Sequence, residues 1–124
     1  MILIDTNIFV DYLRDYGPAI EFFEGIATKE DVIFSAITEA ELVSGKTCND
    51  ENKKESLLHF ISSWDKILVS NKIAVLAGDI TRKNNLGICD AIIAATALIN
   101  DAELLTKNIK HFLVVPNLKV RIPY

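Results

Sequence analysis

The amino-acid sequence predicts an α/β fold in which helices cover both faces of a mostly parallel sheet. Short apolar runs alternate along the chain with longer segments whose apolar residues recur at helical spacing. This alternation is typical of βαβ units, and strands that are buried on both faces read as continuous apolar runs. Half of the 124 residues are apolar, so the chain can bury a substantial core, and we expect residues 1–124 to form a single domain.

The first strand is expected at Ile2–Asp5, where three aliphatic residues end in an aspartate. Apolar residues at helical spacing then predict a helix from Asp5 to Asp15. The Gly-Pro pair at 17–18 breaks this helix, and its proline suits the first turn of a second helix that extends to about Ala27.

The middle of the chain repeats the alternation. β-branched and aromatic residues mark the strands, and a polar run separates the two helices between them. The expected elements are a strand at Asp31–Ser35, a helix at Ile37–Lys46, a loop at Thr47–Lys54, a helix at Glu55–Trp64 and a strand at Ile67–Val69.

Two helices and two strands complete the prediction. A helix is expected from Asn71 to about Asn85, because its apolar residues lie on one face. Residues 88–99, ICDAIIAATALI, are apolar nearly all the way round, which is typical of a buried helix. A fourth strand is expected at Glu103–Thr106 and a fifth at Lys119–Ile122.

The composition excludes some classes of protein. The net charge of −4 argues against binding of nucleic acid through an overall basic surface, although it permits a nuclease that carries a divalent metal. No apolar stretch reaches the roughly 18–20 residues of a membrane span, and no signal peptide is recognisable. Cys48 and Cys89 form no CxxC motif and are expected to be free thiols. We therefore expect a soluble cytoplasmic protein with no membrane partner.

Three acidic residues interrupt apolar segments: Asp5 ends the first strand, Glu41 follows the second, and Asp90 opens the most apolar helix. Ligands of parallel sheets bind beyond the carboxyl ends of the strands, where the strand order reverses, so these acids can converge. Carboxylates that lie close together repel each other unless a cation is present. Oxygen ligands without Cys or His favour Mg²⁺ or Mn²⁺ over zinc, and such sites commonly serve phosphoryl transfer.

Each acid also has a purely structural interpretation. Asp5 can cap the helix that follows it. Glu41 can form a capping box with Thr38, since T-x-x-E is the signature of that motif. Asp90 near a helix N-terminus gains stabilisation from the helix dipole.

Four segments occur in order and at suitable spacing: ILIDTNIFVDYL, FSAITEAELVSG, ICDAIIAATAL and LLTKNIKHFLVVPNL. Together they resemble the PIN domain family, specifically the VapC-type toxin ribonucleases of toxin–antitoxin pairs. The resemblance implies a three-layer α/β/α fold with a parallel sheet of four to five strands in the order 3-2-1-4-5. It also implies an endoribonuclease of a type II toxin–antitoxin system that uses Mg²⁺ or Mn²⁺ to activate water, an RNA substrate, an antitoxin partner and a homodimer.

The resemblance assigns roles residue by residue. It implies that Asp5, Glu41 and Asp90 are the three catalytic and metal-binding acids. The T-x-x-E-L pattern of the family selects Glu41 over Glu39. Four further matches would order the site: Thr6 and Asn7 in the DTN motif, and Thr106 and Asn108 in the T-x-N motif. Lys107 and Lys110 are the preferred contacts to RNA phosphate, with ordinary solvated surface as the alternative.

The chain departs from the family at one position. Many relatives carry a further acid just before the phenylalanine of the last segment, where this chain has His111 before Phe112. Asp79 and Asp101 could replace that acid only in principle. His111 could also act as an acid or a base, whereas His59 lies far from any motif and is expected to be a surface or packing residue.

Two other functions remain open. A PIN fold without its fourth acid could bind RNA or protein without cutting. A phospho-acceptor receiver domain is disfavoured, because the third strand ends in Ser70 rather than aspartate. Apolar residues gather in the first two helices, where they can form core, a dimer surface or an antitoxin groove; they are Phe9, Tyr12, Leu13, Phe22 and Phe23.

Overall fold

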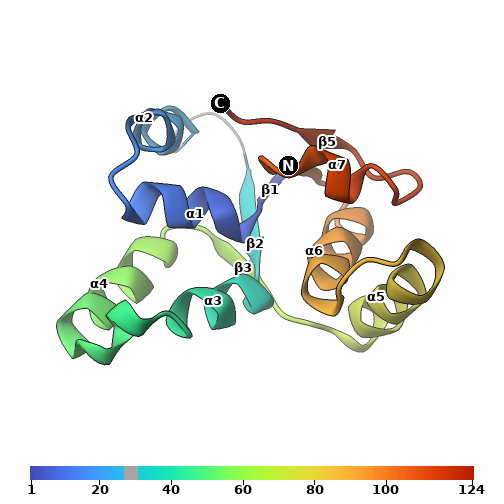
Figure 1. Ribbon diagram of the computed structural model, residues 1–124, viewed down its shortest axis with the longest axis horizontal. Coiled ribbons are helices and arrows are strands. Elements are labelled where there is room, and N and C mark those ends of the chain that lie inside the picture. The colour runs from blue at the N-terminus through green and yellow to red at the C-terminus, as the bar shows by residue number, and fades with distance from the viewer. Residues whose placement is uncertain (27–30) are drawn as a thin grey trace.

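A computed structural model describes residues 1–26 and 31–124. Its described strands form one parallel sheet in the order β3-β2-β1-β4-β5 (Figure 1). The strands are β1 (Ile2–Ile4), β2 (Val32–Ser35), β3 (Asp65–Ile67), β4 (Glu103–Leu105) and β5 (Val120–Arg121). The expected sheet and strand order are confirmed. The second helix was predicted to end at about Ala27, which lies outside the described residues.

Helices form the two outer layers of the fold. In Figure 1, α1, α2 and α4 lie on one side of the sheet and α5 and α6 lie on the other. The helices are α1 (Thr6–Leu13), α2 (Gly17–Ile26), α3 (Ala36–Val43), α4 (Glu51–Ile61), α5 (Asn71–Asn84), α6 (Ile88–Ile99) and α7 (Ile109–Phe112). The three-layer α/β/α architecture is therefore confirmed.

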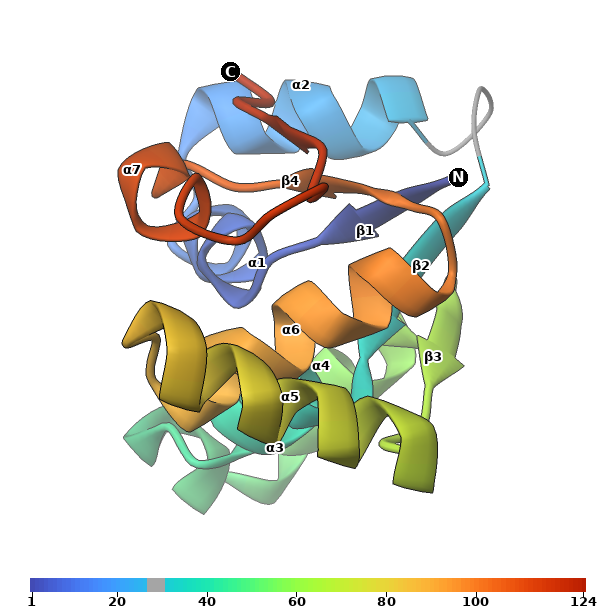
Figure 2. The same cartoon turned by 90° about the vertical axis from the view of Figure 1, so that its right-hand side faces the viewer.

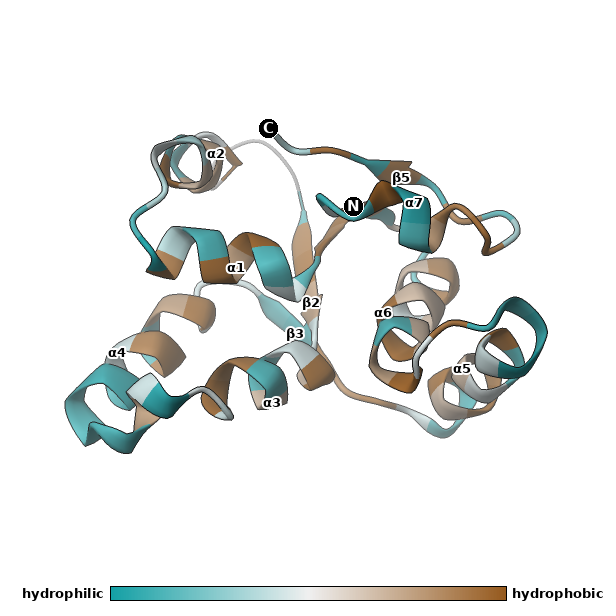
Figure 3. Cartoon of the chain, in the orientation of Figure 1, coloured by the Kyte–Doolittle hydropathy of each residue, from teal (hydrophilic) through white to brown (hydrophobic). Residues whose placement is uncertain are grey.

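The alternation of side chains along β1 divides the core in two. Ile2 and Ile4 pack with Phe9 and Phe23 on the side of α1 and α2, whereas Leu3 packs with Ile93 on the side of α6. All of these side chains are buried, and the hydropathy colouring shows β2 as apolar, whereas the edge strand β3 is largely polar (Figure 3). A strand buried on both faces explains the unbroken apolar run at the start of the chain.

The start of α4 differs from the prediction. This helix begins at Glu51 rather than Glu55, and a short 3₁₀ helix, Lys46–Asn49, overlaps the predicted loop at Thr47–Lys54. Asp50 caps α4, because its carboxylate accepts hydrogen bonds from the backbone N–H groups of Asn52 (2.9 Å) and Lys53 (3.3 Å). The first turns of α4 bury no apolar side chain, so apolar periodicity gave no signal for them.

The prediction of β3 is wrong by two residues. The strand is Asp65–Ile67, and Leu68 and Val69 lie beyond it with exposed side chains. Its pairing ends where Ile67 meets Ser35, the last residue of β2, so the apolar residues that follow have no strand to pair with. The one-turn helix α7 was not predicted, because four residues are too few to reveal a period.

No helix in the described part of the chain is long and apolar enough to cross a membrane.

Candidate active site

The carboxyl ends of β1 and β4 lie side by side, at the point where the order of the strands reverses. The register pairs Ile4 with Leu105, and the Asp5 N–H donates to the Leu105 carbonyl at 3.0 Å. Figure 2 shows that α1 and α7, which follow these strands, begin at the same end of the sheet. The structure therefore brings Asp5 next to Thr106 although 101 residues separate them in sequence.

Asp5 is a buried carboxylate, 4% exposed, with a hydrogen bond to each oxygen. Its Oδ1 accepts from the Thr6 N–H at 2.8 Å, which makes Asp5 the N-cap of α1. Its Oδ2 accepts from the Thr106 hydroxyl at 2.7 Å. The capping interpretation is thus confirmed, and it uses only one of the two oxygens.

Thr106 connects Asp5 to the segment that leads into α7. While its hydroxyl donates to Asp5, its oxygen accepts from the Asn108 N–H at 3.0 Å. Thr106 is fully buried, whereas Asn108 is exposed at the start of α7. One hydroxyl therefore fixes both the buried carboxylate and the loop beside it.

Glu41 reaches the same region through a chain of hydroxyl groups. The Thr6 hydroxyl donates to Glu41 Oε1 at 2.8 Å, and Thr6 and Thr38 place their Oγ1 atoms 2.9 Å apart. Because an ionised carboxylate can only accept, the single proton of Thr6 is used by Glu41, and Thr38 must donate to Thr6. The role of Thr38 in this chain was not predicted, since nothing in the sequence relates it to Thr6.

The capping-box interpretation of Glu41 is wrong. Ser35, not Thr38, caps α3, and its Oγ accepts from the Ile37 N–H at 3.1 Å. Glu39 forms an ion pair with Lys66 at 3.0 Å, so Glu41 is the acid that meets Thr6. This difference follows from the helix, because side chains two positions apart point about 200° away from each other.

Asp90 lies in the first turn of α6, as the dipole interpretation requires. Its Oδ2 lies 3.1 Å from Nε2 of His111, which α7 carries. The other two acids considered as replacements have different partners: Asp79 pairs with Arg82 at 2.8 Å and Asp101 with Lys119 at 3.8 Å.

The pKa of Asp5 reflects both its burial and the two other acids. Burial is the largest factor that raises the pKa of Asp5 above its ordinary value, and the hydrogen bonds from Thr106 and Thr6 oppose it. The negative charges of Asp90 and Glu41 raise this pKa further, as expected for carboxylates that repel each other. Burial also raises the pKa of the Cys89 thiol, and the charges of Glu41 and Asp90 add to this shift.

The donors at this end of the sheet fit a hard divalent cation. They are carboxylate oxygens, and the buried Asp5 carboxylate carries a charge that a cation would stabilise. Across residues 1–26 and 31–124, no three Asp, Glu, His or Cys side chains are yet arranged as ligands of one ion. Glu41 and Asp90 instead face Thr6 and His111, so the three carboxylates must move closer together to share one ion.

The remaining predicted residues differ in their surroundings. Asn7 is exposed on the first turn of α1, and Lys110 is exposed on α7. Lys107 forms an ion pair with Asp11 at 2.9 Å, and its Nζ lies 5.0 Å from the centroid of the Tyr16 ring. Lys107 thus has an intramolecular partner that the sequence did not indicate.

The C-terminal segment adds a further contact to this pair. The Tyr124 hydroxyl donates to Asp11 Oδ2 at 2.6 Å, and Lys107 also lies 5.3 Å from the centroid of the Tyr124 ring. Burial, followed by the bond to Asp11, raises the pKa of Tyr124. Asp11 and Tyr124 are 113 residues apart, so no local signal could have linked them.

Both cysteines are free thiols, as predicted, and His59 is exposed on α4.

Comparison with known proteins identifies the family. The sequence model of the PIN domain family matches residues 2–117 of this chain. The chain is 37% identical over 125 residues to ribonuclease VapC19 of Mycobacterium tuberculosis, covering 96% of this chain and 98% of the relative. It is 30% identical over 124 residues to ribonuclease VapC2 of Rickettsia felis, covering 94% and 92%.

Solved structures agree with this result. A toxin–antitoxin complex from Klebsiella pneumoniae contains a chain that superposes with a TM-score of 0.84 at 29% identity, covering 100% of this chain and 98% of that one. The VapBC2 complex of Rickettsia felis, bound to a DNA fragment from its promoter, gives a TM-score of 0.83 at 28% identity, with 98% of each chain covered. The protein therefore belongs to the PIN domain family.

Proposed function

We propose that this chain is the toxin of a type II toxin–antitoxin pair and acts as a metal-dependent endoribonuclease. The observation that carries the proposal is the set of acids at the carboxyl end of the sheet. Asp5 lies at the carboxyl end of β1, and its burial, together with the charges of Asp90 and Glu41, raises its pKa. Acids so arranged suit a divalent cation, and two relatives across nearly the whole chain are named ribonucleases.

In this proposal Asp5, Glu41 and Asp90 hold Mg²⁺ or Mn²⁺. When bound, the cation supplies positive charge to the phosphate oxygens and lowers the pKa of water. Thr106 and Thr6 orient the carboxylates through their hydroxyl groups. In-line attack of water on phosphorus breaks the bond to the 3′ oxygen, which leaves a 3′-hydroxyl and a 5′-phosphate.

Further residues receive supporting roles. Asn7 and Asn108 are exposed beside Asp5 and Thr106, where their amides can order water or RNA. Lys110 is exposed on α7 and can contact RNA phosphate. Lys107 can do so as well, once phosphate replaces its ion pair with Asp11.

The test is cleavage of an end-labelled structured RNA in Mn²⁺, Mg²⁺ or EDTA. We expect cutting only with metal, and product 5′ ends that need dephosphorylation before polynucleotide kinase can label them. Cutting that persists in EDTA would contradict the proposal. Metal binding and RNA binding without cutting would favour a non-catalytic binding module instead.

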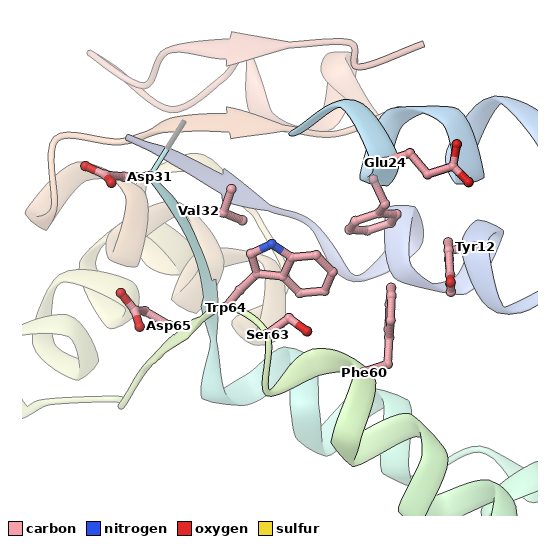
Figure 4. A pocket seen from close by; sticks show the side chains of 9 residues that line it. Tyr12, Glu24, Asp31, Val32, Phe60, Ser63, Trp64 and Asp65 are labelled. Carbon is pink, nitrogen blue, oxygen red and sulfur yellow. The ribbon is translucent and has the colours of Figure 1, made fainter. Parts of the chain in front are cut away.

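We also propose that an antitoxin binds along α1, α2 and α4. A cavity of about 490 Å³ lies there, with aromatic walls from Tyr12, Phe23, Phe60 and Trp64. Figure 4 shows Asp31 and Asp65 on one side of Trp64 and Glu24 on the other. Within the described residues, none of these three acids forms an ion pair. The cavity therefore suits a partner segment with a basic side chain beside an apolar one.

A second cavity extends this surface to Glu41. It has a volume of about 860 Å³, shares Tyr12 and Phe60 with the first, and reaches Glu41. A partner that fills both cavities would therefore reach the site at Glu41. Solved relatives include VapBC and other toxin–antitoxin complexes, which supports such a partner.

Trp64 is the only tryptophan of the chain, so its fluorescence reports on the first cavity. We expect the protein encoded beside this gene to shift that fluorescence and to stop RNA cleavage over the same range of concentration. Inhibition without any change in Trp64 emission would show that the partner binds elsewhere.

A homodimer is proposed from the exposed apolar residues that follow β3. Leu68 and Val75 are 68% and 69% exposed, and β3 is the edge strand of the sheet. In sedimentation velocity experiments we expect a dimer that Val75→Glu disrupts and Leu113→Glu does not. A monomer at all concentrations would contradict this.

We propose a cytoplasmic location, since the substrate is RNA and both thiols are free.

A further inference from the structure

His111 places an imidazole at the edge of the acid set. It lies on α7, its backbone N–H donates to the Asn108 carbonyl at 3.1 Å, and its ring packs edge-on against Phe112. Its Nε2 lies 3.1 Å from Asp90 Oδ2, and the side chain is 46% exposed. The ring is therefore held in place but open to solutes.

The same short segment carries His111 and fixes Asp5. Thr106 bonds to the Asp5 carboxylate and accepts from the Asn108 N–H, and Asn108 in turn accepts from the His111 N–H. The imidazole is thus tied by backbone and hydroxyl contacts to the most buried of the acids. Its position relative to the carboxylates does not depend on a long flexible loop.

We propose that His111 Nε2 is a ligand of the divalent cation, next to Asp90, and that the site consequently prefers Mn²⁺ to Mg²⁺. This inference rests on the proposed function, because it concerns the same site. Two neighbouring ligands of an octahedral ion, each bonded at roughly 2.1 Å, lie roughly 3 Å apart. The observed separation of His111 Nε2 and Asp90 Oδ2 is 3.1 Å, so one cation can replace the direct contact with little movement of either side chain.

The preference for Mn²⁺ follows from the donor atoms. Mg²⁺ is ligated almost entirely by oxygen, whereas imidazole nitrogen binds first-row transition metals well. A carboxylate at position 111 would restore a set of oxygen donors. His111→Asp should therefore shift the selectivity back toward Mg²⁺, whereas His111→Gln should weaken Mn²⁺ binding and leave Mg²⁺ binding within about twofold.

The experiment is direct observation of Mn²⁺ bound to the purified protein. Binding is measured by loss of the electron paramagnetic resonance signal of free Mn²⁺, and nitrogen ligation by electron spin-echo modulation from ¹⁴N. The chain has two histidines, and the other, His59, is exposed on α4. His59→Gln is therefore the matched control.

We expect imidazole modulation in the wild type and in His59→Gln, and none in His111→Gln. We also expect Mn²⁺ affinity to fall about 10-fold or more in His111→Gln. Wild-type protein that binds Mn²⁺ without imidazole modulation would overturn the role of His111 and leave the proposed nuclease intact. Wild-type protein that binds no divalent cation would overturn both. The wild-type spectrum decides the ligation even if a variant fails to fold.

Discussion

Asp5 combines two roles that are usually separate, a helix cap and a charged group at the end of a buried strand. Its Oδ1 accepts from the Thr6 N–H, and its Oδ2 accepts from the Thr106 hydroxyl. A buried carboxylate is costly unless such bonds or a cation compensate for its lost hydration. Thr106 is therefore the residue on which the position of this carboxylate most depends.

Thr106→Val removes the hydroxyl and keeps the shape of the side chain. We expect RNA cleavage and metal affinity to fall by about 10–100-fold, because the variant leaves Asp5 Oδ2 without its hydrogen bond. Single-turnover cleavage and Mn²⁺ titration measure the two effects.

Thr81→Val is the matched control. Within the described residues the Thr81 hydroxyl is buried without a hydrogen-bond partner, so its loss should leave cleavage unchanged and stability equal or slightly higher. Equal activity of Thr106→Val and wild type would contradict the role given to Thr106.

At the scale of elements, the segment after β4 is held against α1 by the C-terminal residues. Asp11 on α1 accepts from both Lys107 and Tyr124. Burial acts to raise the pKa of Asp11, but the hydrogen bonds from Tyr124 and Lys107 and the charge of Lys107 outweigh it, so the pKa is lowered. These contacts link three segments that are remote in sequence.

Tyr124→Phe tests this link. The variant loses a hydrogen bond to a charged acceptor, and we expect the free energy of unfolding at neutral pH to fall by about 1–2 kcal/mol. Since the folded pKa of Asp11 is lowered, its contribution is present above the unfolded pKa and is lost as the pH falls through the folded pKa. The difference between wild type and variant should therefore shrink in acid.

Urea unfolding at several pH values measures this difference, with Tyr16→Phe as the control because Tyr16 contributes its ring rather than its hydroxyl. A destabilisation that is the same at acidic and neutral pH would show that the Asp11 carboxylate is not involved.

At the scale of the whole molecule, the buried charge of Asp5 should lower the free energy of unfolding of the metal-free protein at neutral pH. The pKa of Asp5 is raised, so between its unfolded and folded pKa values the native state binds more protons than the unfolded chain. The free energy of unfolding then falls as the pH rises through that interval. An ionised Asp5 is thus a cost at neutral pH, which a cation can offset.

Asp5→Asn removes this cost and keeps a good helix cap. In EDTA we expect the variant to be more stable than wild type at neutral pH, and the difference to vanish at a pH below both pKa values. Added Mn²⁺ should stabilise wild type and not the variant. Urea unfolding measures both effects, and a variant that is less stable in EDTA at neutral pH would contradict the account.

The sequence predicted much of this molecule because its signals were either periodic or specific to the family. The alternation of apolar runs gave the parallel sheet, and the resemblance to PIN domains gave the strand order and selected Glu41 over Glu39. Contacts between distant residues gave no such signal: Thr38 with Thr6, and Tyr124 with Asp11. The boundary of β3 was missed because the pairing of β2, not apolarity, ends that strand.

The central claim is that Asp5 is required for metal-dependent cleavage of RNA. The most direct test compares single-turnover cleavage by wild type, Asp5→Asn and Asp79→Asn in saturating Mn²⁺. Asp79 is an acid on α5 that pairs with Arg82, so it controls for the loss of one negative charge. We predict cleavage by wild type and Asp79→Asn and none by folded Asp5→Asn. Equal cleavage by all three proteins would contradict the claim.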